Sequence, residues 1–281
     1  MRKRILKEVI SMINQQLEIK SSLIVSICGG SCTRKSSLLA TYLTNYFKSK
    51  SILISQDQFQ LNPSYISNIN PDYKFDHPDN FAINDCYEAL IKLKKKQIVE
   101  IPNYNFTKEE VIIYKTVHPA PVIIFEGLYT NFGELQKLSD ISIYAKSHWY
   151  TRMIRRVLRN TLDRYKGREA SIIFESFCNS VTMAHLDFIK LQEESSNFII
   201  ETPLEFDEII NYYNLKPVDY NPTKNDNFFT IDCDKNISFK INNISSKQYE
   251  LLFFYKNKQY LKMKITNELA DHLKKIDWLA Y

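Results

Sequence analysis

The residues best suited to chemistry form a short loop near the start of the chain. This loop follows an apolar run and reads Gly29, Gly30, Ser31, Cys32, Thr33, Arg34, Lys35, Ser36, Ser37. It fits the phosphate-binding pattern G-x-x-x-x-G-K-[ST] except at Arg34, where the second glycine belongs. In that pattern backbone N–H groups surround phosphate oxygens, Lys35 reaches the outer phosphates and Ser36 binds Mg²⁺. The alternative is a strand-to-helix turn that binds no ligand.

Two carboxylates end other predicted strands. The runs 22–28, 51–55 and 121–125 are short, apolar and rich in β-branched residues, which indicates strands buried on both faces. Asp57 follows the second run and Glu126 follows the third. Because ligands gather beyond the carboxyl ends of parallel strands, we expect Gly29, Asp57 and Glu126 to converge at one edge of a sheet.

The elements that must position these residues alternate between strand and helix. Helical spacing of apolar residues predicts helices over 3–19, 36–47, 80–96, 148–164 and 169–192, and further strands are expected over 140–145 and 197–200. This alternation predicts an α/β fold of the P-loop NTPase type, a parallel sheet flanked by helices.

The sequence changes character after about residue 207. A polar stretch precedes predicted short strands near 227–241, a hairpin over 249–264 and a closing helix over 267–275. We therefore expect three parts: an N-terminal helix (1–20), a P-loop domain (21–207) and a small α+β appendage (208–281).

Composition narrows the class of protein. The 281 residues are 44% hydrophobic, 25% charged and 13% aromatic, which is typical of a packed globular chain. A net charge of +5 is too dilute to indicate nucleic-acid or membrane binding. The five cysteines are scattered, and no apolar run has the length of a membrane span. The expected protein is cytoplasmic, with reduced thiols and no nucleic-acid or membrane partner.

A series of motifs resembles one known family. The segments SQDQF, FDHPDNF, IPNYNF, FEGL and RRVLR occur in one order between about residues 22 and 200. Their order and spacing closely resemble the uridine-cytidine kinase family of P-loop phosphotransferases. The resemblance implies ATP and Mg²⁺ as cofactors, a small-molecule nucleoside or related acceptor, and a possible homo-oligomer.

The resemblance also implies a role for individual residues. Asp57 matches the general base toward the nucleoside 5'-hydroxyl, and Glu126 matches the carboxylate of the Mg²⁺ site. Three residues match the nucleoside pocket, namely Phe75, Asp76 and Tyr104. Four arginines match the helix and lid over the phosphates, namely Arg156, Arg159, Arg164 and Arg168. For Arg152 and Arg155 a solvated helix face is the preferred interpretation.

Four residues depart from the family pattern. Arg34 replaces a loop glycine, Gln60 stands where a tyrosine is usual, Glu109 replaces a histidine and Ser176 replaces a glutamine. The last three lie where the family binds the base, so the machinery for phosphate transfer is better kept than that for the pyrimidine. The leading hypothesis is a kinase of a pyrimidine nucleoside or related hydroxyl compound. The alternatives are a catalytically impaired nucleotide-binding regulator and a P-loop kinase of another small acceptor, such as a pantothenate- or phosphoribulose-type hydroxyl.

Overall fold

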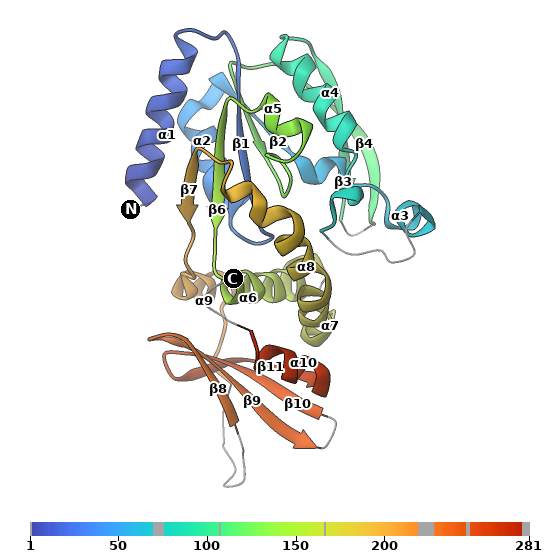
Figure 1. Ribbon diagram of the computed structural model, residues 1–281, viewed down its shortest axis with the longest axis vertical. Coiled ribbons are helices and arrows are strands. Elements are labelled where there is room, and N and C mark those ends of the chain that lie inside the picture. Colours follow the sequence, from blue (N-terminus) through green and yellow to red (C-terminus); the bar gives the residue numbers. More distant parts are fainter. Residues whose placement is uncertain are drawn as a thin grey trace. The chain divides into compact units, whose positions relative to one another are not determined.

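The computed structural model describes residues 2–69, 76–106, 108–165, 167–218, 228–245 and 248–276. The chain divides into two compact units, which Figure 1 draws as one ribbon. The first comprises Met1–Ser147 and Cys178–Thr202, and the second comprises His148–Phe177 and Pro203–Tyr281. This division groups residues 148–177 with the C-terminal sheet and so differs from the predicted domain boundary at residue 207. The boundary at residue 207 remains a prediction.

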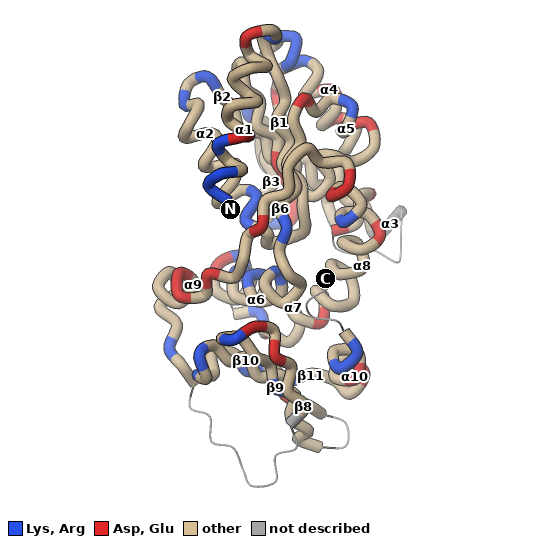
Figure 2. The backbone as a smooth tube through the Cα atoms, turned by 60° about the vertical axis from the view of Figure 1, so that its left-hand side comes forward, with Lys and Arg blue, Asp and Glu red and all other residues tan. Residues whose placement is uncertain are grey.

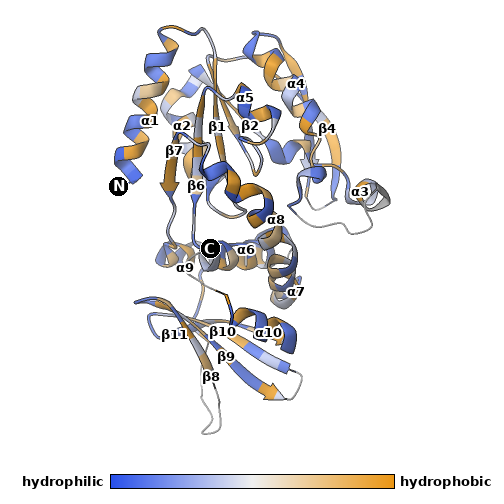
Figure 3. Cartoon of the chain, viewed as in Figure 1, coloured by the Kyte–Doolittle hydropathy of each residue, from blue (hydrophilic) through white to orange (hydrophobic). Residues whose placement is uncertain are grey.

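The first unit is built on a parallel sheet of five strands. The strands are β1 (Leu23–Gly29), β2 (Ser51–Ser55), β5 (Val122–Glu126), β6 (Ile141–Lys146) and β7 (Phe198–Glu201). Their order is β2-β5-β1-β6-β7, with every neighbouring pair parallel. The predicted α/β fold is therefore confirmed. Mostly apolar residues fill these strands, as Figure 3 shows in orange.

Each face of the sheet is covered by a separate apolar core. Successive side chains of a strand point to opposite faces, and in β1 Leu23, Val25 and Ile27 pack with α1 (Arg2–Leu17) and α2 (Thr41–Phe47). Ile24 points the other way, toward α4 (Ile83–Lys94). Burial on both faces explains why these strands read as unbroken apolar runs.

The remaining elements of the first unit include some that the sequence did not indicate. These are α3 (Pro63–Ile69), α5 (Glu134–Leu138) and the hairpin of β3 (Val99–Asn105) with β4 (Glu110–Val117), whereas α8 (Thr182–Ala184) lies within the predicted helix over 169–192. The predicted helix over 36–47 begins as a π-helical stretch, Lys35–Ala40, before α2. The predicted helix over 169–192 is instead a run of short helical segments, because π-helical stretches at Phe177–Val181 and His185–Ile189 interrupt it.

The second unit combines helices with an antiparallel sheet. Its helices are α6 (Trp149–Arg159), α7 (Ala170–Ser176), α9 (Phe206–Tyr213) and α10 (Asn267–Leu273). Its strands are β8 (Phe228–Asp234), β9 (Ile237–Ser245), β10 (Gln248–Tyr255) and β11 (Lys258–Thr266), in the order β11-β10-β9-β8. The expected α+β character of the C-terminal region is confirmed. In the part of the chain described, no helix combines the length and apolarity that crossing a bilayer requires.

One basic residue of α6 is placed differently from the expectation. Figure 2 shows basic positions along this helix, and a solvated face was expected for Arg152 and Arg155. Arg152 is instead fully buried, with its guanidinium 5.9 Å from the centre of the Phe177 ring. The guanidinium plane packs well against an aromatic ring, which is one way an arginine enters a core. The prediction for Arg152 is therefore wrong.

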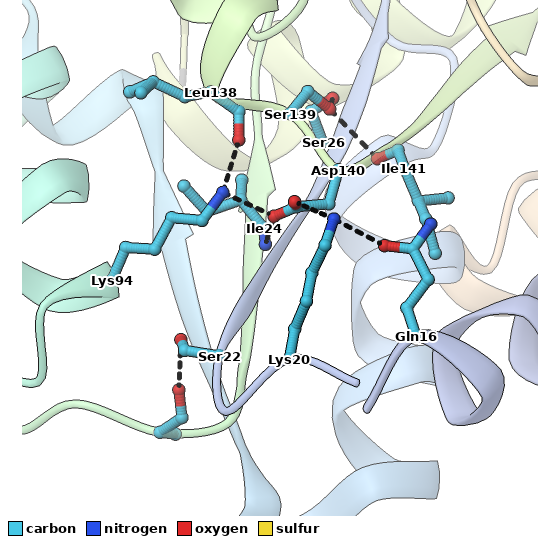
Figure 4. A network of polar contacts seen from close by, with 11 residues as sticks. Gln16, Lys20, Ser22, Ile24, Ser26, Lys94, Leu138, Ser139, Asp140 and Ile141 are labelled. Carbon is cyan, nitrogen blue, oxygen red and sulfur yellow. Dashed lines mark hydrogen bonds and ion pairs between the residues drawn. The ribbon is translucent and has the colours of Figure 1, made fainter. Parts of the chain in front are cut away.

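A polar cluster holds the amino-terminal edge of the parallel sheet together (Figure 4). The Asp140 carboxylate accepts hydrogen bonds from Lys20 Nζ, Lys94 Nζ and the Ile24 backbone N–H, each at 2.8 Å. Burial raises the pKa of this carboxyl, but the hydrogen bonds outweigh that effect and hold the pKa below its usual range. The cluster joins the chain after α1, the end of α4 and the start of β6.

Candidate active site

The phosphate-binding loop leaves the end of β1 at Gly29. Any other residue at this position would push the neighbouring backbone of β6 aside. Gly29 has a φ of 136°, and a Cβ there would lie 2.4 Å from the Ala145 carbonyl oxygen on β6. Both the backbone conformation and the close approach therefore require glycine. The loop is fixed at its first residue, as the predicted strand-loop-helix arrangement needs.

Arg34 keeps the loop shape although it departs from the pattern. Its φ of 63° and ψ of 27° lie in the left-handed region, which glycine adopts without strain. Its carbonyl accepts hydrogen bonds from the N–H groups of Leu38 at 3.0 Å and Leu39 at 3.3 Å, which begins the helical stretch. The loop therefore preserves the backbone expected of a glycine at this position, and the arginine carries the strain.

Lys35 is buried and directed into the loop. Its Nζ donates a hydrogen bond to the Gly30 carbonyl oxygen at 2.9 Å, and the Thr33 hydroxyl donates to the same oxygen at 2.9 Å. Burial lowers the pKa of Lys35, while the charges of Glu126 and Asp57 oppose this effect. The lysine, the predicted base and the predicted metal ligand therefore share one electrostatic environment.

Glu126 lies at the end of β5 between two hydroxyl groups. One carboxylate oxygen accepts from the Ser36 Oγ at 2.8 Å, and the other accepts from the Ser55 Oγ at 2.6 Å. Ser55 and Glu126 are register partners in β2 and β5, which explains the contact. Burial raises the pKa of Glu126, and the nearby Asp57 raises it further. Hard oxygen donors of this kind suit Mg²⁺, so Ser36 and Glu126 fit the predicted metal site.

Asp57 lies in a single 3₁₀ turn, Gln56–Phe59, directly after β2. Ser55 caps this turn, and the Gln58 side chain accepts a hydrogen bond from the Ser55 N–H at 3.1 Å. Glu126 is the register partner of Ser55 in β2 and of Ile27 in β1, so the strand end that leads to Asp57 lies beside Glu126 and near the strand that leads to the phosphate-binding loop. The expected convergence of strand ends is thus found.

The residues predicted for the acceptor are only partly brought together. Asp76 contributes to the electrostatic environment of Lys35 and has a left-handed φ of 62°. Tyr104 is buried on β3 with its ring 5.2 Å from that of Phe106, and Glu109 occupies the turn between β3 and β4. Phe75 lies outside the described residues.

Gln60 lies beyond the turn that carries Asp57. It is half-buried and forms an isolated antiparallel bridge with Phe81. A role in binding the base therefore stays a prediction for Gln60.

The predicted lid residues all belong to the second unit. Arg156 is buried on α6, and Arg159 donates from Nε to the Asn160 side-chain oxygen at 3.1 Å. Arg164 ends the π-helical stretch after α6. The Arg168 guanidinium lies 4.5 Å from the centre of the Tyr165 ring, and Ser176 ends α7. Closure of these residues over the phosphates remains a prediction.

Three site residues were not singled out from the sequence. Ser55 holds Glu126, Gln56 is fully buried beside Asp57, and Tyr129 lies in the chain after Glu126 and Gly127. Ser55 and Gln56 stand at the same strand end as Asp57, so the rule that located Asp57 could have found them. Tyr129 offered no comparable signal.

The parallel sheet and the phosphate-binding loop after β1 place the protein in the class of P-loop proteins. The family described as "Phosphoribulokinase / Uridine kinase family" matches residues 24–207. The chain belongs to this family, which confirms the resemblance drawn from the motifs.

Relatives and solved structures agree with this assignment. Uridine kinase-like protein 3 of Arabidopsis thaliana is 29% identical over 63% of this chain and 38% of its own length. The uridine kinase of Borreliella burgdorferi is 31% identical over 63% of this chain and 85% of its own. The matched region thus spans under half of the plant relative.

Two solved structures share the fold. A possible uridine kinase from Bacillus stearothermophilus matches with a TM-score of 0.51 and 14% identity, over 71% of this chain and 100% of that chain. A phosphoribulokinase from Rhodobacter spheroides matches with a TM-score of 0.51 and 12% identity, over 79% of this chain and 80% of that chain. Because the two carry names for different acceptors, the shared fold does not select the acceptor.

Proposed function

We propose that this protein is an ATP-dependent phosphotransferase that transfers the γ-phosphoryl group of ATP to the 5'-hydroxyl of a pyrimidine nucleoside or a related acceptor. One arrangement carries the proposal: the buried Lys35 points into the phosphate-binding loop, Ser36 donates a hydrogen bond to the buried Glu126, and Asp57 follows β2, the strand beside Glu126. Phosphoryl transfer needs charge stabilisation and positioning, together with a base near the attacking hydroxyl. These residues supply each requirement.

The cofactor roles follow from the donors in the loop. The N–H groups of the loop and the Lys35 ammonium would bind the phosphates of ATP, with Lys35 exchanging the Gly30 carbonyl for phosphate oxygens. Ser36 and Glu126 would hold Mg²⁺, because a carboxylate together with phosphate oxygens and water suits this ion. Mg²⁺ would offset negative charge on the phosphates.

Asp57 would act as the general base. As the acceptor oxygen forms its bond to the γ-phosphorus and the bond to the β–γ bridging oxygen breaks, the hydroxyl proton passes to the Asp57 carboxylate, and ADP leaves.

The proposal for the acceptor depends on which residues of the pocket match the family pattern and which depart from it. Asp76 and Tyr104 would receive the ribose and a flat ring. A carboxylate at Glu109 can only accept hydrogen bonds, so it disfavours a pyrimidine carbonyl and favours an exocyclic amino group. We expect cytidine to be preferred over uridine by a modest factor.

A panel of acceptors tests the proposal. Wild-type protein with Mg·ATP is given cytidine, uridine, the purine nucleosides, pantothenate, glycerate and ribulose 5-phosphate, and products are identified by mass spectrometry. The proposal predicts a nucleoside 5'-monophosphate, with kcat/KM highest for cytidine. A uridine preference contradicts the assignment of Glu109. Transfer only to a non-nucleoside indicates another small-acceptor kinase.

The strained Arg34 and the altered pocket favour one further candidate, a nucleotide-binding regulator without turnover. This candidate predicts Mg·ATP-dependent thermal stabilisation with no phosphorylated product from any acceptor in the panel. The same samples therefore separate the two functions.

A further inference from the structure

A buried polar connection runs from the residue beside the proposed base to the backbone of Asp76, the residue proposed to bind the acceptor. Gln56 precedes Asp57 and is fully buried. Its side-chain oxygen accepts a hydrogen bond from the Tyr129 backbone N–H at 2.8 Å. The Tyr129 hydroxyl in turn donates to the backbone carbonyl of Asp76. One amide and one phenol thus link segments that lie far apart in the sequence.

The Gln56 side chain occupies space that is open only because Gly127 has no side chain. A Cβ at Gly127 would lie 2.4 Å from the Gln56 Cβ and 2.6 Å from its side-chain oxygen. The glycine directly after Glu126 therefore makes room for the glutamine, and the glutamine fixes the backbone at Tyr129. The hydrogen bond pairs the Gln56 oxygen with the Tyr129 N–H and so ties the Asp57 turn to the chain after Gly127, while the Gln56 Nε2 has no partner among the described residues.

Tyr129 is fixed on both sides of its ring as well as at its backbone. The side chain is fully buried, and its ring packs edge-on against Phe81 and Phe132, with centroids 5.7 and 5.5 Å away. Burial raises the pKa of Tyr129, and the charge of Asp76 raises it further. The phenol therefore stays protonated and remains a hydrogen-bond donor at neutral pH.

Asp76 needs such support because its backbone is strained. Its φ of 62° lies in the left-handed region, which residues other than glycine adopt less readily. A strained conformation persists where surrounding contacts hold it. The Tyr129 hydroxyl contacts the carbonyl of this residue and so restrains the direction in which the Asp76 side chain leaves the backbone.

We infer that Tyr129 is a positioning residue. Its hydroxyl holds Asp76 in the orientation needed to bind the acceptor, and its backbone contact with Gln56 fixes the position of Asp76 relative to the turn that carries Asp57. The inference rests on the proposed function for the role of Asp76. Tyr129 acts through Asp76 and does not itself contact the reacting atoms.

The Tyr129→Phe variant tests the inference because it removes the hydroxyl and keeps the ring. Loss of one hydrogen bond corresponds to about a tenfold change in an equilibrium constant. We expect the KM for cytidine to rise about tenfold, with kcat and the Kd for Mg·ATP each within about twofold of wild type. The matched control is Tyr255→Phe, which removes a tyrosine hydroxyl that donates to Asp207 in the second unit. This control should leave all three constants unchanged.

Amide hydrogen exchange provides a readout that does not depend on activity. In Tyr129→Phe, peptides covering 76–81 should exchange faster, while those covering the phosphate loop should keep the wild-type rate. An unchanged KM for an active wild type overturns the inference, as does a parallel loss of Mg·ATP affinity. If the wild type phosphorylates no nucleoside, the proposed function fails. The exchange of 76–81 then decides alone whether Tyr129 positions Asp76, and an unchanged rate overturns that claim.

Discussion

Lys35 has a partner inside its own loop, the Gly30 carbonyl oxygen, and in the proposed function it would exchange this oxygen for phosphate oxygens of the nucleotide. A hydrogen bond to a charged group contributes about 1.5–3 kcal/mol. We therefore expect Lys35→Ala to raise the Kd for Mg·ATP by about 10- to 100-fold. Isothermal titration measures this change. Lys50→Ala, which alters an exposed lysine of the same unit, serves as the control and should bind as wild type does.

Arg34 allows strain and side-chain chemistry to be separated with two variants. Arg34→Ala removes the side chain but leaves a Cβ at a left-handed φ, whereas Arg34→Gly removes the strain as well. We expect the glycine variant to be more stable than the alanine variant by about 1 kcal/mol in urea unfolding. We also expect it to bind Mg·ATP more tightly than wild type does.

Weaker Mg·ATP binding in both Arg34 variants would mean instead that the guanidinium belongs to the phosphate site. Equal stability of the two variants would contradict the assignment of strain to this residue.

At the scale of elements, the Asp140 cluster makes the stability of the first unit depend on pH. The folded-state pKa of Asp140 is depressed, so its contribution is present above the unfolded pKa and is lost as pH falls through the folded value. Asp140→Asn should therefore lower the free energy of unfolding by about 1–3 kcal/mol at pH 7. Urea unfolding at pH 7 and near pH 3 should show the difference between wild type and variant shrink at the acid pH. A constant difference would exclude the carboxylate charge as its origin.

The strands β1 and β5 could be located because they are buried throughout, which demands continuous apolar residues. The edge strand β2 has the same apolar character although it is only partly buried. The hairpin was missed because Pro102 interrupts β3, and because the apolar run of β4, 111–114, is exposed and so differs from the buried runs that mark the parallel strands. The helical region 169–192 was placed correctly, but its π-helical interruptions have no simple sequence signal.

The residues of the candidate site also fall into those that the sequence could predict and those that it could not. Lys35, Asp57 and Glu126 could be predicted because each follows from a motif or a strand end. Ser55, Gln56 and Tyr129 act through contacts between strands and buried segments, and such contacts depend on register and packing. A single sequence shows that Ser55 and Gln56 stand at the same strand end as Asp57 but not what they contact, and it gives no signal for Tyr129.

At the scale of the whole molecule, the chain crosses between its units near Ser147 and Thr202, and these two residues are joined by a hydrogen bond. The Ser147 hydroxyl donates to the Thr202 carbonyl at 2.8 Å, and the Thr202 hydroxyl donates to the Thr33 carbonyl of the phosphate loop at 2.9 Å. Thr202→Val keeps the shape but removes this donor. We expect a loss of about 1–2 kcal/mol in stability and a several-fold rise in the Kd for Mg·ATP. Thr202→Ser, which keeps the hydroxyl, should restore Mg·ATP binding, and a serine variant as weak as the valine variant would contradict this role.

The measurement that tests the central claim most directly is a single turnover at saturating Mg·ATP, comparing wild type with Asp57→Asn. The amide keeps the size of the side chain but cannot accept the hydroxyl proton. Wild type should convert bound ATP and cytidine to ADP and the nucleoside 5'-monophosphate. Asp57→Asn should bind Mg·ATP with an affinity close to wild type but transfer the phosphoryl group about 10²- to 10⁴-fold more slowly. Equal transfer rates in the two proteins would contradict the assignment of Asp57 and, with it, the proposed chemistry of this site.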